Sequence, residues 1–161
     1  MASLPRRAIG LVPMQLVITE TLAASVDAVF DVISDPRRRL EWQSSLRYVT
    51  LRTAGPARTG TAWYEVTHGG LRFELEITEH TRPSRWAERA QGRFADARIA
   101  VDFAPGPSER TTSLVVTVEI DFKGPAALAA PIVRATMPAA LRADLRRAEA
   151  LARSADVKTA A

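Results

Sequence analysis

Two runs of alternating apolar and polar residues, 61–68 and 71–77, meet at the dipeptide Gly69-Gly70. A glycine pair between two such runs predicts a β-hairpin with a two-residue turn. Residues that lie opposite one another in this hairpin project to the same face, so the turn fixes the register. The expected opposite pairs are His68 with Leu71, Val66 with Phe73, Tyr64 with Leu75, and Ala62 with Ile77.

This register predicts an apolar face that carries two polar tips, Tyr64 and His68. The other face has mostly polar residues, which is typical of a surface in contact with water. Trp63 would lie on that outer face, where an exposed aromatic side chain would mark an interface such as that of a homodimer, unless the register differs locally. Because the apolar face needs a cover, the chain must supply one from its helices.

Other segments of the chain also alternate, and turn-forming residues separate them. Residues 46–122 carry no further helix signal, and the short links between strands indicate an antiparallel meander. Together with a first strand near the N-terminus, seven strands are predicted, at residues 14–22, 46–53, 59–68, 71–79, 85–91, 95–103 and 111–122.

Two short helices are predicted after the first strand. Ser25 offers a side-chain oxygen that can cap a helix over residues 26–33. Pro36 disfavours helix for the residue before it and can open a second helix over residues 37–42.

A long helix is predicted after Gly124-Pro125, to about Ser154, because an apolar stripe recurs at helical spacing. Pro138 removes a backbone donor, so it would kink this helix near Arg134 or divide it in two. A kinked cover could gate a cavity, with Met137 adapting to ligands of varied shape, or the bend could be local and have no gating role.

The chain has 161 residues and no cysteine. This length predicts one domain, over residues 14–154, with a loose leader at 1–13 and a frayed tail at 155–161. The absence of cysteine excludes thiol nucleophiles and cysteine-ligated metal centres, and it is compatible with a cytoplasmic location. No apolar run reaches the length of an export signal core or of a membrane span of about 20 residues. We therefore expect a cytoplasmic protein without a transmembrane segment.

The formal net charge is +4, and Lys123 and Lys158 are the only lysines among 22 basic residues. The arginine clusters, at 37–39 and 146–147, are short and have acidic neighbours. Nucleic-acid binding needs clustered cations, so these runs predict a solvated face and no nucleic-acid partner.

The stretch 26–42 reads VDAVFDVISDPRRRLEW, and the stretch 55–63 reads GPARTGTAW. With the order of strands and helices, these stretches resemble the polyketide cyclase/dehydrase branch of the START-like (SRPBCC) superfamily, over residues 14–152. The resemblance implies an α+β helix-grip fold, in which a curved antiparallel sheet and the C-terminal helix enclose an apolar cavity. It also implies ligands such as lipids, sterols or polyketides, since members include ligand carriers and aromatase/cyclases.

Tyr64 and His68 are candidates for chemistry because the predicted register sets both on the apolar face. His68 would be a hydrogen-bond partner or general acid/base for a bound carbonyl, and Tyr64 a phenol donor. The alternative is that His68 lies at the end of its strand, beside Gly69, and reaches water.

Glu88 is the best candidate for an acid or base. If Glu79 lies opposite Ser84, Glu88 faces inward between apolar neighbours, where its pKa would be raised or its charge paired. A register that differs by one residue would instead turn Arg89 and Gln91 inward and leave Glu88 in water.

Two tryptophans are expected inside the protein. Trp86 would either line the cavity or pack in the core, and the two positions are the same when no ligand is bound. Trp42 closes the second short helix and is expected to pack under the sheet. The two histidines, His68 and His80, lie beyond opposite ends of the strand predicted at 71–79. They are therefore far apart, and no metal site is expected.

Motifs of serine hydrolases, phosphate-binding loops and dinucleotide-binding folds are absent from the sequence. Three functions stay open. The first, and favoured, is binding of a hydrophobic small molecule such as a lipid, isoprenoid or polyketide, without a cofactor. The second is a cyclase/dehydratase-type or isomerase enzyme in which Glu88 works with Tyr64 or His68. The third is a protein-interaction domain with a filled cavity.

The residues predicted to contact the ligand share the apolar side of the sheet or the facing side of the long helix. They are Tyr64, Val66, His68, Phe73, Leu75, Trp86, Glu88, Ile99, Val101, Val116, Met137, Leu141 and Leu145.

Overall fold

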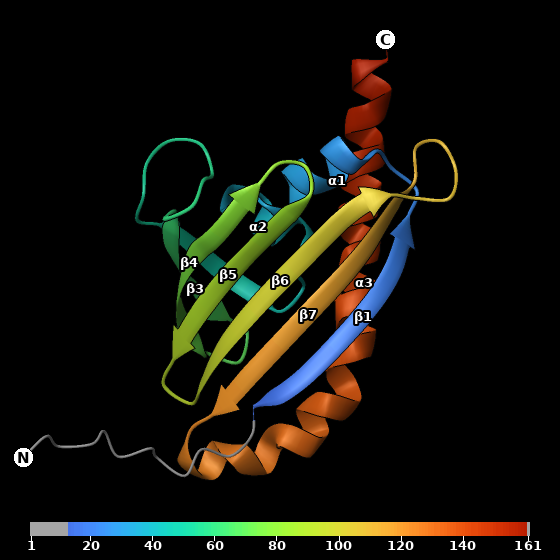
Figure 1. Ribbon diagram of the computed structural model, residues 1–161. Helices are drawn as coiled ribbons and strands as arrows, with labels where there is room; N and C mark the ends of the chain where they lie inside the picture. Colours follow the sequence, from blue (N-terminus) through green and yellow to red (C-terminus); the bar gives the residue numbers. More distant parts are fainter. Residues whose placement is uncertain (1–12, 161) are drawn as a thin grey trace, which may run out of the picture.

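Seven antiparallel strands form one curved sheet in the order β1-β7-β6-β5-β4-β3-β2, in a computed structural model that describes residues 13–160 (Figure 1). Strands that follow one another in the chain also pair from β2 to β7, and β1 joins the meander beside β7. The strands are β1 (Met14–Leu22), β2 (Leu46–Leu51), β3 (Ala62–Thr67), β4 (Arg72–Thr81), β5 (Arg85–Gly92), β6 (Ala95–Pro105) and β7 (Thr112–Phe122). The seven strands and their order confirm the predicted meander.

The helices lie where the capping signals predict them. Helix α1 (Val26–Ile33) begins at Ser25, whose Oγ accepts a hydrogen bond from the Ala28 amide at 3.3 Å. A 3₁₀ turn, η1 (Pro36–Arg38), leads into α2 (Arg39–Trp42). The long segment consists of η2 (Gly124–Ala129) and α3 (Ala130–Thr159). Because the sheet curves around α3, the predicted helix-grip architecture is confirmed (Figure 1).

Helix α3 is continuous through Pro138, so the predicted division into two helices is wrong. Figure 1 shows instead a bend, with the first part of the segment across the lower end of the sheet and the rest along it. The helix also continues past Ser154 to Thr159. Asp156 explains why, since its carboxylate accepts hydrogen bonds from the Ser25 amide at 2.8 Å and the Ser25 hydroxyl at 2.5 Å. The predicted leader lies outside the described residues, except Pro13.

The β3–β4 hairpin has a register one residue away from the predicted one. Trp63 pairs with Leu75, and Glu65 pairs with Phe73. The cause is a three-residue loop: Gly70 has a φ of +80° and donates to the carbonyl of Thr67 at 2.9 Å, while the Thr67 amide donates to the Leu71 carbonyl at 2.9 Å.

A shift of one residue exchanges the two faces of a strand. Trp63 and Glu65 therefore point inward and are buried, whereas Tyr64 is exposed. Val66 pairs with Arg72 on the outer face. The predicted inward positions of Tyr64 and Val66, and the predicted exposed interface at Trp63, are wrong.

The β4–β5 pair differs from the predicted register by two residues, which preserves the face. Ile77 pairs with Glu88 and Leu75 with Ala90, and the register shifts between Ile77 and Glu79. Glu88 is buried, so the inward orientation is confirmed. Arg89 points outward and pairs with Glu76 at 2.6 Å.

Side chains fill the end of the grip next to α1. The large residues that pack there include Leu22, Phe30, Ile33, Trp42, Trp63, Ile77, Trp86, Phe103 and Leu114. None of the helices described between residues 13 and 160 is long and apolar enough to cross a membrane.

Candidate functional site: a cavity between the sheet and the long helix

The other end of the grip is hollow. A cavity of about 800 Å³ lies between the inner face of the sheet and the first half of α3. Alanines form much of its wall, at positions 90, 95, 97, 126, 129 and 140. Small side chains on both facing elements leave the space unfilled, in contrast to the aromatic residues at the end next to α1. The larger apolar lining residues are Phe73, Leu75, Ile99, Val118, Ile120, Phe122, Val133, Met137 and Leu141.

The cavity opens to solvent along the first half of α3. Lining residues that are themselves exposed mark this opening, and they include Leu71 and Phe94 in the β3–β4 and β5–β6 turns. On the helix side, Ala129, Thr136 and Ala140 line the opening. A cavity with apolar walls and one open side is typical of a binding site for an apolar molecule.

The inner end of the cavity is polar and contains a buried ion-pair cluster. Arg39, from the first turn of α2, contacts Glu88 through two bonds, Nη1 to Oε2 at 2.7 Å and Nη2 to Oε1 at 3.2 Å. Its Nε forms a further ion pair with Glu65. All three residues are buried and line the cavity. Because buried charges are costly when unpaired, these contacts with Arg39 are what permit both carboxylates to lie inside.

Two tryptophans hold the guanidinium group of Arg39 in place. Its central carbon lies 5.3 Å from the ring centroid of Trp63 and 6.0 Å from that of Trp86, within the range of cation–π attraction. The Trp63 Nε1–H also donates to Glu65 Oε1 at 2.9 Å. Arg39 is thus fixed by packing as well as by charge.

The pKa of Glu88 is raised to about 7. Burial is the largest cause, and the negative charge of Glu65 raises the pKa further, while the positive charge of Arg39 and its hydrogen bonds oppose both. A carboxyl group with this pKa exchanges protons at neutral pH, so the cluster can hold a polar group of a ligand or transfer a proton.

A second polar contact fixes α3 over the cavity. The Ser44 amide and hydroxyl donate to Asp144 Oδ1, at 3.1 Å and 2.8 Å, and Arg147 contacts the same oxygen at 3.3 Å. Next to this contact, the buried Oε1 atom of Gln43 accepts no hydrogen bond from any described residue. Gln43 lines the cavity, but this oxygen is itself covered.

The predicted ligand residues fall into three groups. Those that line the cavity are Phe73, Leu75, Glu88, Ile99, Met137 and Leu141. Those buried in the filled core instead are Trp86, Val101, Val116 and Leu145. Those outside the cavity lining are Tyr64, Val66 and His68.

Each misplaced residue at the β3 end has a local cause. Tyr64 points outward, under the guanidinium of Arg52 at 5.1 Å. His68 lies in the turn itself and is exposed, as its alternative interpretation stated. The predicted partnership of Glu88 with Tyr64 or His68 is therefore wrong, and the partners of Glu88 are Arg39 and Glu65.

Sequence reasoning missed Arg39 and Glu65. Arg39 is the third residue of a triple arginine, which reads as a solvated run. One signal was present: Trp42 follows Arg39 by three residues, and residues at this spacing share a face of a helix. A buried Trp42 therefore implies that Arg39, and not Leu40, points inward.

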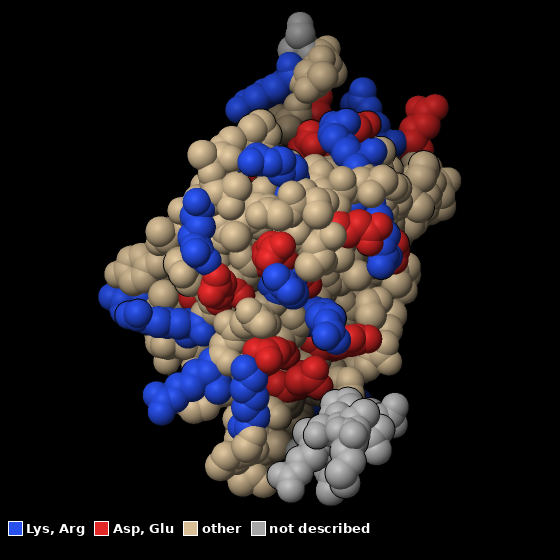
Figure 2. Space-filling model, turned by 60° about the vertical axis from the view of Figure 1, so that its left-hand side comes forward, with Lys and Arg blue, Asp and Glu red and all other residues tan. Residues whose placement is uncertain are grey.

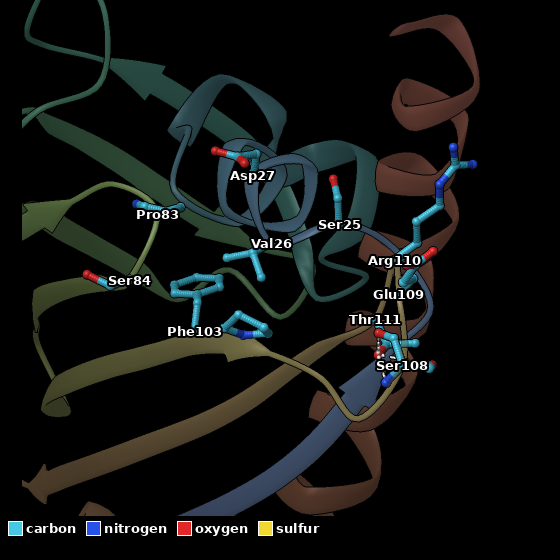
Figure 3. Close-up of a pocket in the computed structure, with 11 residues that line it drawn as sticks. Ser25, Val26, Asp27, Pro83, Ser84, Phe103, Ser108, Glu109, Arg110 and Thr111 are labelled. Carbon is cyan, nitrogen blue, oxygen red and sulfur yellow. Dashed lines mark hydrogen bonds between the residues drawn. The ribbon is translucent and has the colours of Figure 1, made fainter. Parts of the chain in front are cut away.

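A smaller cavity, of about 490 Å³, lies at the opposite end of the molecule (Figure 3). Several of its polar side chains are already paired: Ser25 binds Asp156, Asp27 binds Arg82, and Ser108 binds Thr111. In Figure 3 the Arg110 side chain points away from Val26 and Phe103. The larger cavity is therefore the candidate site.

Neither a metal site among the described residues nor a large patch of one charge on the face in Figure 2 marks another site. Within residues 13–160, no group of three or more His, Asp or Glu side chains could hold a metal ion. On the face drawn in Figure 2, basic and acidic side chains are interspersed without a large patch of one sign.

The chain matches the sequence profile of a family described as "Polyketide cyclase / dehydrase and lipid transport" over residues 14–153. A comparison with curated proteins finds no sequence match.

Several solved structures have a similar fold. A START superfamily protein from Mycobacterium smegmatis has a TM-score of 0.71 at 15% identity, and the alignment covers 85% of this chain and 98% of that one. The aromatase/cyclase Zhui from Streptomyces sp. R1128 has a TM-score of 0.74 at 14% identity, with 88% and 94% covered. A protein from Thermus thermophilus has a TM-score of 0.71 at 18% identity, with 88% and 99% covered.

Proposed function

Because the chain belongs to the polyketide cyclase/dehydrase and lipid transport family, we propose that its cavity binds a hydrophobic small molecule, such as a lipid, an isoprenoid or a polyketide. The observation that carries this proposal is the hollow, apolar half of the grip, about 800 Å³ in volume and open along α3. Each CH₂ group that moves from water into such a cavity contributes about 0.8 kcal/mol.

The polar inner end would orient this ligand. Gln43 and the cluster of Arg39, Glu65 and Glu88 lie at one end, while the exposed apolar side chains of Leu71 and Phe94 lie at the opening. A molecule with one polar group and a long apolar body fits this division, because its polar group would lie against the charged and polar side chains of the inner end.

A second candidate function is that of an enzyme of the cyclase or dehydratase type, acting without a cofactor. It is supported by the pKa of about 7 for Glu88 inside the cavity wall, which suits a general acid or base. Against it stands the two-pronged contact with Arg39, which occupies both carboxyl oxygens. A substrate would have to displace Arg39 from one of them, so we favour binding over catalysis.

Native mass spectrometry tests the binding function directly. The full chain, purified from its own host under gentle conditions, is expected to carry an added mass that organic solvent extracts and that corresponds to an apolar compound. Protein without any such mass, and without affinity for fluorescent apolar probes, would contradict the proposal. If a ligand is identified, conversion of that compound by wild type but not by Glu88→Gln would support the enzyme instead.

A further inference from the structure

The first half of the long helical segment is apolar on all sides. Residues 124–140 contain one charged residue, Arg134. One side of this segment is accounted for, because Ala129, Val133 and Met137 line the cavity. A helix that is apolar all round normally lies in a protein core or in a membrane, so its outer side requires an explanation.

Large apolar side chains on this outer side are exposed. Leu128 and Ile132, one helical turn apart, are 84% and 68% exposed. Across the opening, Leu71 and Phe94 are 42% and 49% exposed. The two hairpin turns, η2 and the start of α3 all lie at the lower end of the molecule in Figure 1. We call the four exposed residues Leu71, Phe94, Leu128 and Ile132 the rim patch. Such a group of exposed apolar side chains indicates an interaction surface.

Positive charge accompanies the rim patch. Arg72 and Arg93 line the opening, and Arg134 is exposed on the helix. Within the described part of the chain, none of these three arginines forms an ion pair. The nearby carboxylate of Asp96 is paired with Lys123 at 2.7 Å. The surface around the opening is thus apolar at its centre and carries unpaired cations.

From this arrangement we infer that the rim patch docks on an anionic lipid bilayer, with Leu128 and Ile132 among the acyl chains and the three arginines against the headgroup phosphates. Apolar side chains flanked by arginines match the two layers that a bilayer surface presents. A protein partner would supply the apolar complement equally well, but the unpaired cations and the position of the patch around an apolar opening favour the bilayer. Docking there would let an apolar molecule pass between bilayer and cavity without crossing water.

Flotation of the full chain with lipid vesicles tests this inference. We expect binding to phosphatidylcholine vesicles that contain phosphatidylglycerol, weaker binding without phosphatidylglycerol, and weaker binding at high salt. The double variant Leu128→Ser/Ile132→Ser should lower the bound fraction at least about tenfold, because both insertions are lost. Arg72→Gln/Arg93→Gln should remove the preference for phosphatidylglycerol.

The matched control is Val17→Ser/Val115→Ser, which replaces two exposed apolar residues on the outer face of the sheet. It should bind vesicles as the wild type does. Equal binding by wild type and Leu128→Ser/Ile132→Ser, or no binding of wild type to either vesicle, would overturn the inference. So would light scattering that shows a dimer for wild type and a monomer for Leu128→Ser/Ile132→Ser, because the patch would then join two copies.

Vesicle binding does not depend on an occupied cavity. Ala97→Trp, which narrows the cavity from within, should bind vesicles like wild type. If the proposed ligand binding fails in native mass spectrometry, the outcome of vesicle flotation is unaffected. If membrane docking fails in flotation, the outcome of the ligand experiment is unaffected.

Discussion

Arg39 is the counter-charge of two buried carboxylates, Glu65 and Glu88. Each of these ions has lost its contact with water, which costs several kcal/mol unless a partner compensates it. The rings of Trp63 and Trp86 lie against the guanidinium and fix it at the depth where both carboxylates reach it. The burial of both carboxylates therefore depends on Arg39.

Replacing Arg39 by methionine should lower the free energy of unfolding by about 3–5 kcal/mol, since it leaves buried carboxylates without a counter-charge. Urea unfolding at neutral pH measures this loss. Arg89→Met, on the outer face of β5 and paired with the exposed Glu76, is the control and should stay within about 0.5 kcal/mol of wild type. Similar losses for both variants would contradict the assigned role of Arg39.

The raised pKa of Glu88 predicts how the free energy of unfolding changes with pH. Its pKa is about 7 in the folded protein and 4.5 as the ordinary value, so the folded state keeps the proton longer than the unfolded state does. The free energy of unfolding of wild type, relative to Glu88→Gln, should therefore fall as pH rises from about 4.5 to about 7, by on the order of 3 kcal/mol. Urea unfolding of both proteins across this range checks the slope, and a constant difference would refute the raised pKa.

The sequence predicts Glu88 but not its partners, for physical reasons. The sequence leaves both orientations of Glu88 open, and the inward one survives a register error of two residues because the side-chain period of a strand is two. The inward orientation of Arg39 depends instead on a 3₁₀ turn, and that of Glu65 on a hairpin loop. A change of one residue in either the turn or the loop would point the side chain outward.

At the scale of elements, the β3–β4 loop decides which side chains of β3 reach the interior. Three loop residues, with Gly70 at a positive φ, set Trp63 and Glu65 inward. A two-residue loop would have set Tyr64 inward. Since both loops suit the dipeptide Gly69-Gly70, local sequence does not choose between them, and the burial of the large Trp63 side chain favours the observed one.

Substitution of Gly70 by alanine should cost about 1 kcal/mol of unfolding free energy, because only glycine adopts its φ of +80° without strain. No neighbouring atom lies within 4 Å of the added Cβ, so the cost is that of the backbone alone. Gly69→Ala is the matched control: its φ is not positive and its Cβ would meet only Thr67 Oγ1, at 3.8 Å. Equal melting temperatures for the two variants would argue against the three-residue loop.

The apolar stripe predicts one long helix that contains Pro138. In the structure α3 bends but continues without a break. Its extension to Thr159 was not predicted, because it depends on the contact of Asp156 with Ser25, 131 residues earlier in the chain. A contact between residues so far apart in the chain leaves no pattern in the sequence around either residue.

At the scale of the whole molecule, the order of strands and helices could be predicted because each element carries its own alternation, cap or turn. The cavity could be expected only from the resemblance to the family, since a volume depends on how side chains from several elements fill the space together. Here aromatic residues fill the end next to α1, and alanines on β5, β6 and α3 leave the other end open.

The affinity of a fluorescent apolar probe for a matched pair of variants tests most directly whether the cavity between the sheet and α3 binds an apolar molecule. Ala97 points into the cavity, whereas Ala100, on the same strand, points to the outer face. Wild type and Ala100→Trp should bind the probe equally, and Ala97→Trp should bind it at least about tenfold more weakly, because the indole takes up ligand space. Equal affinity of Ala97→Trp and Ala100→Trp would show that the probe binds elsewhere and would contradict a binding site between the sheet and α3.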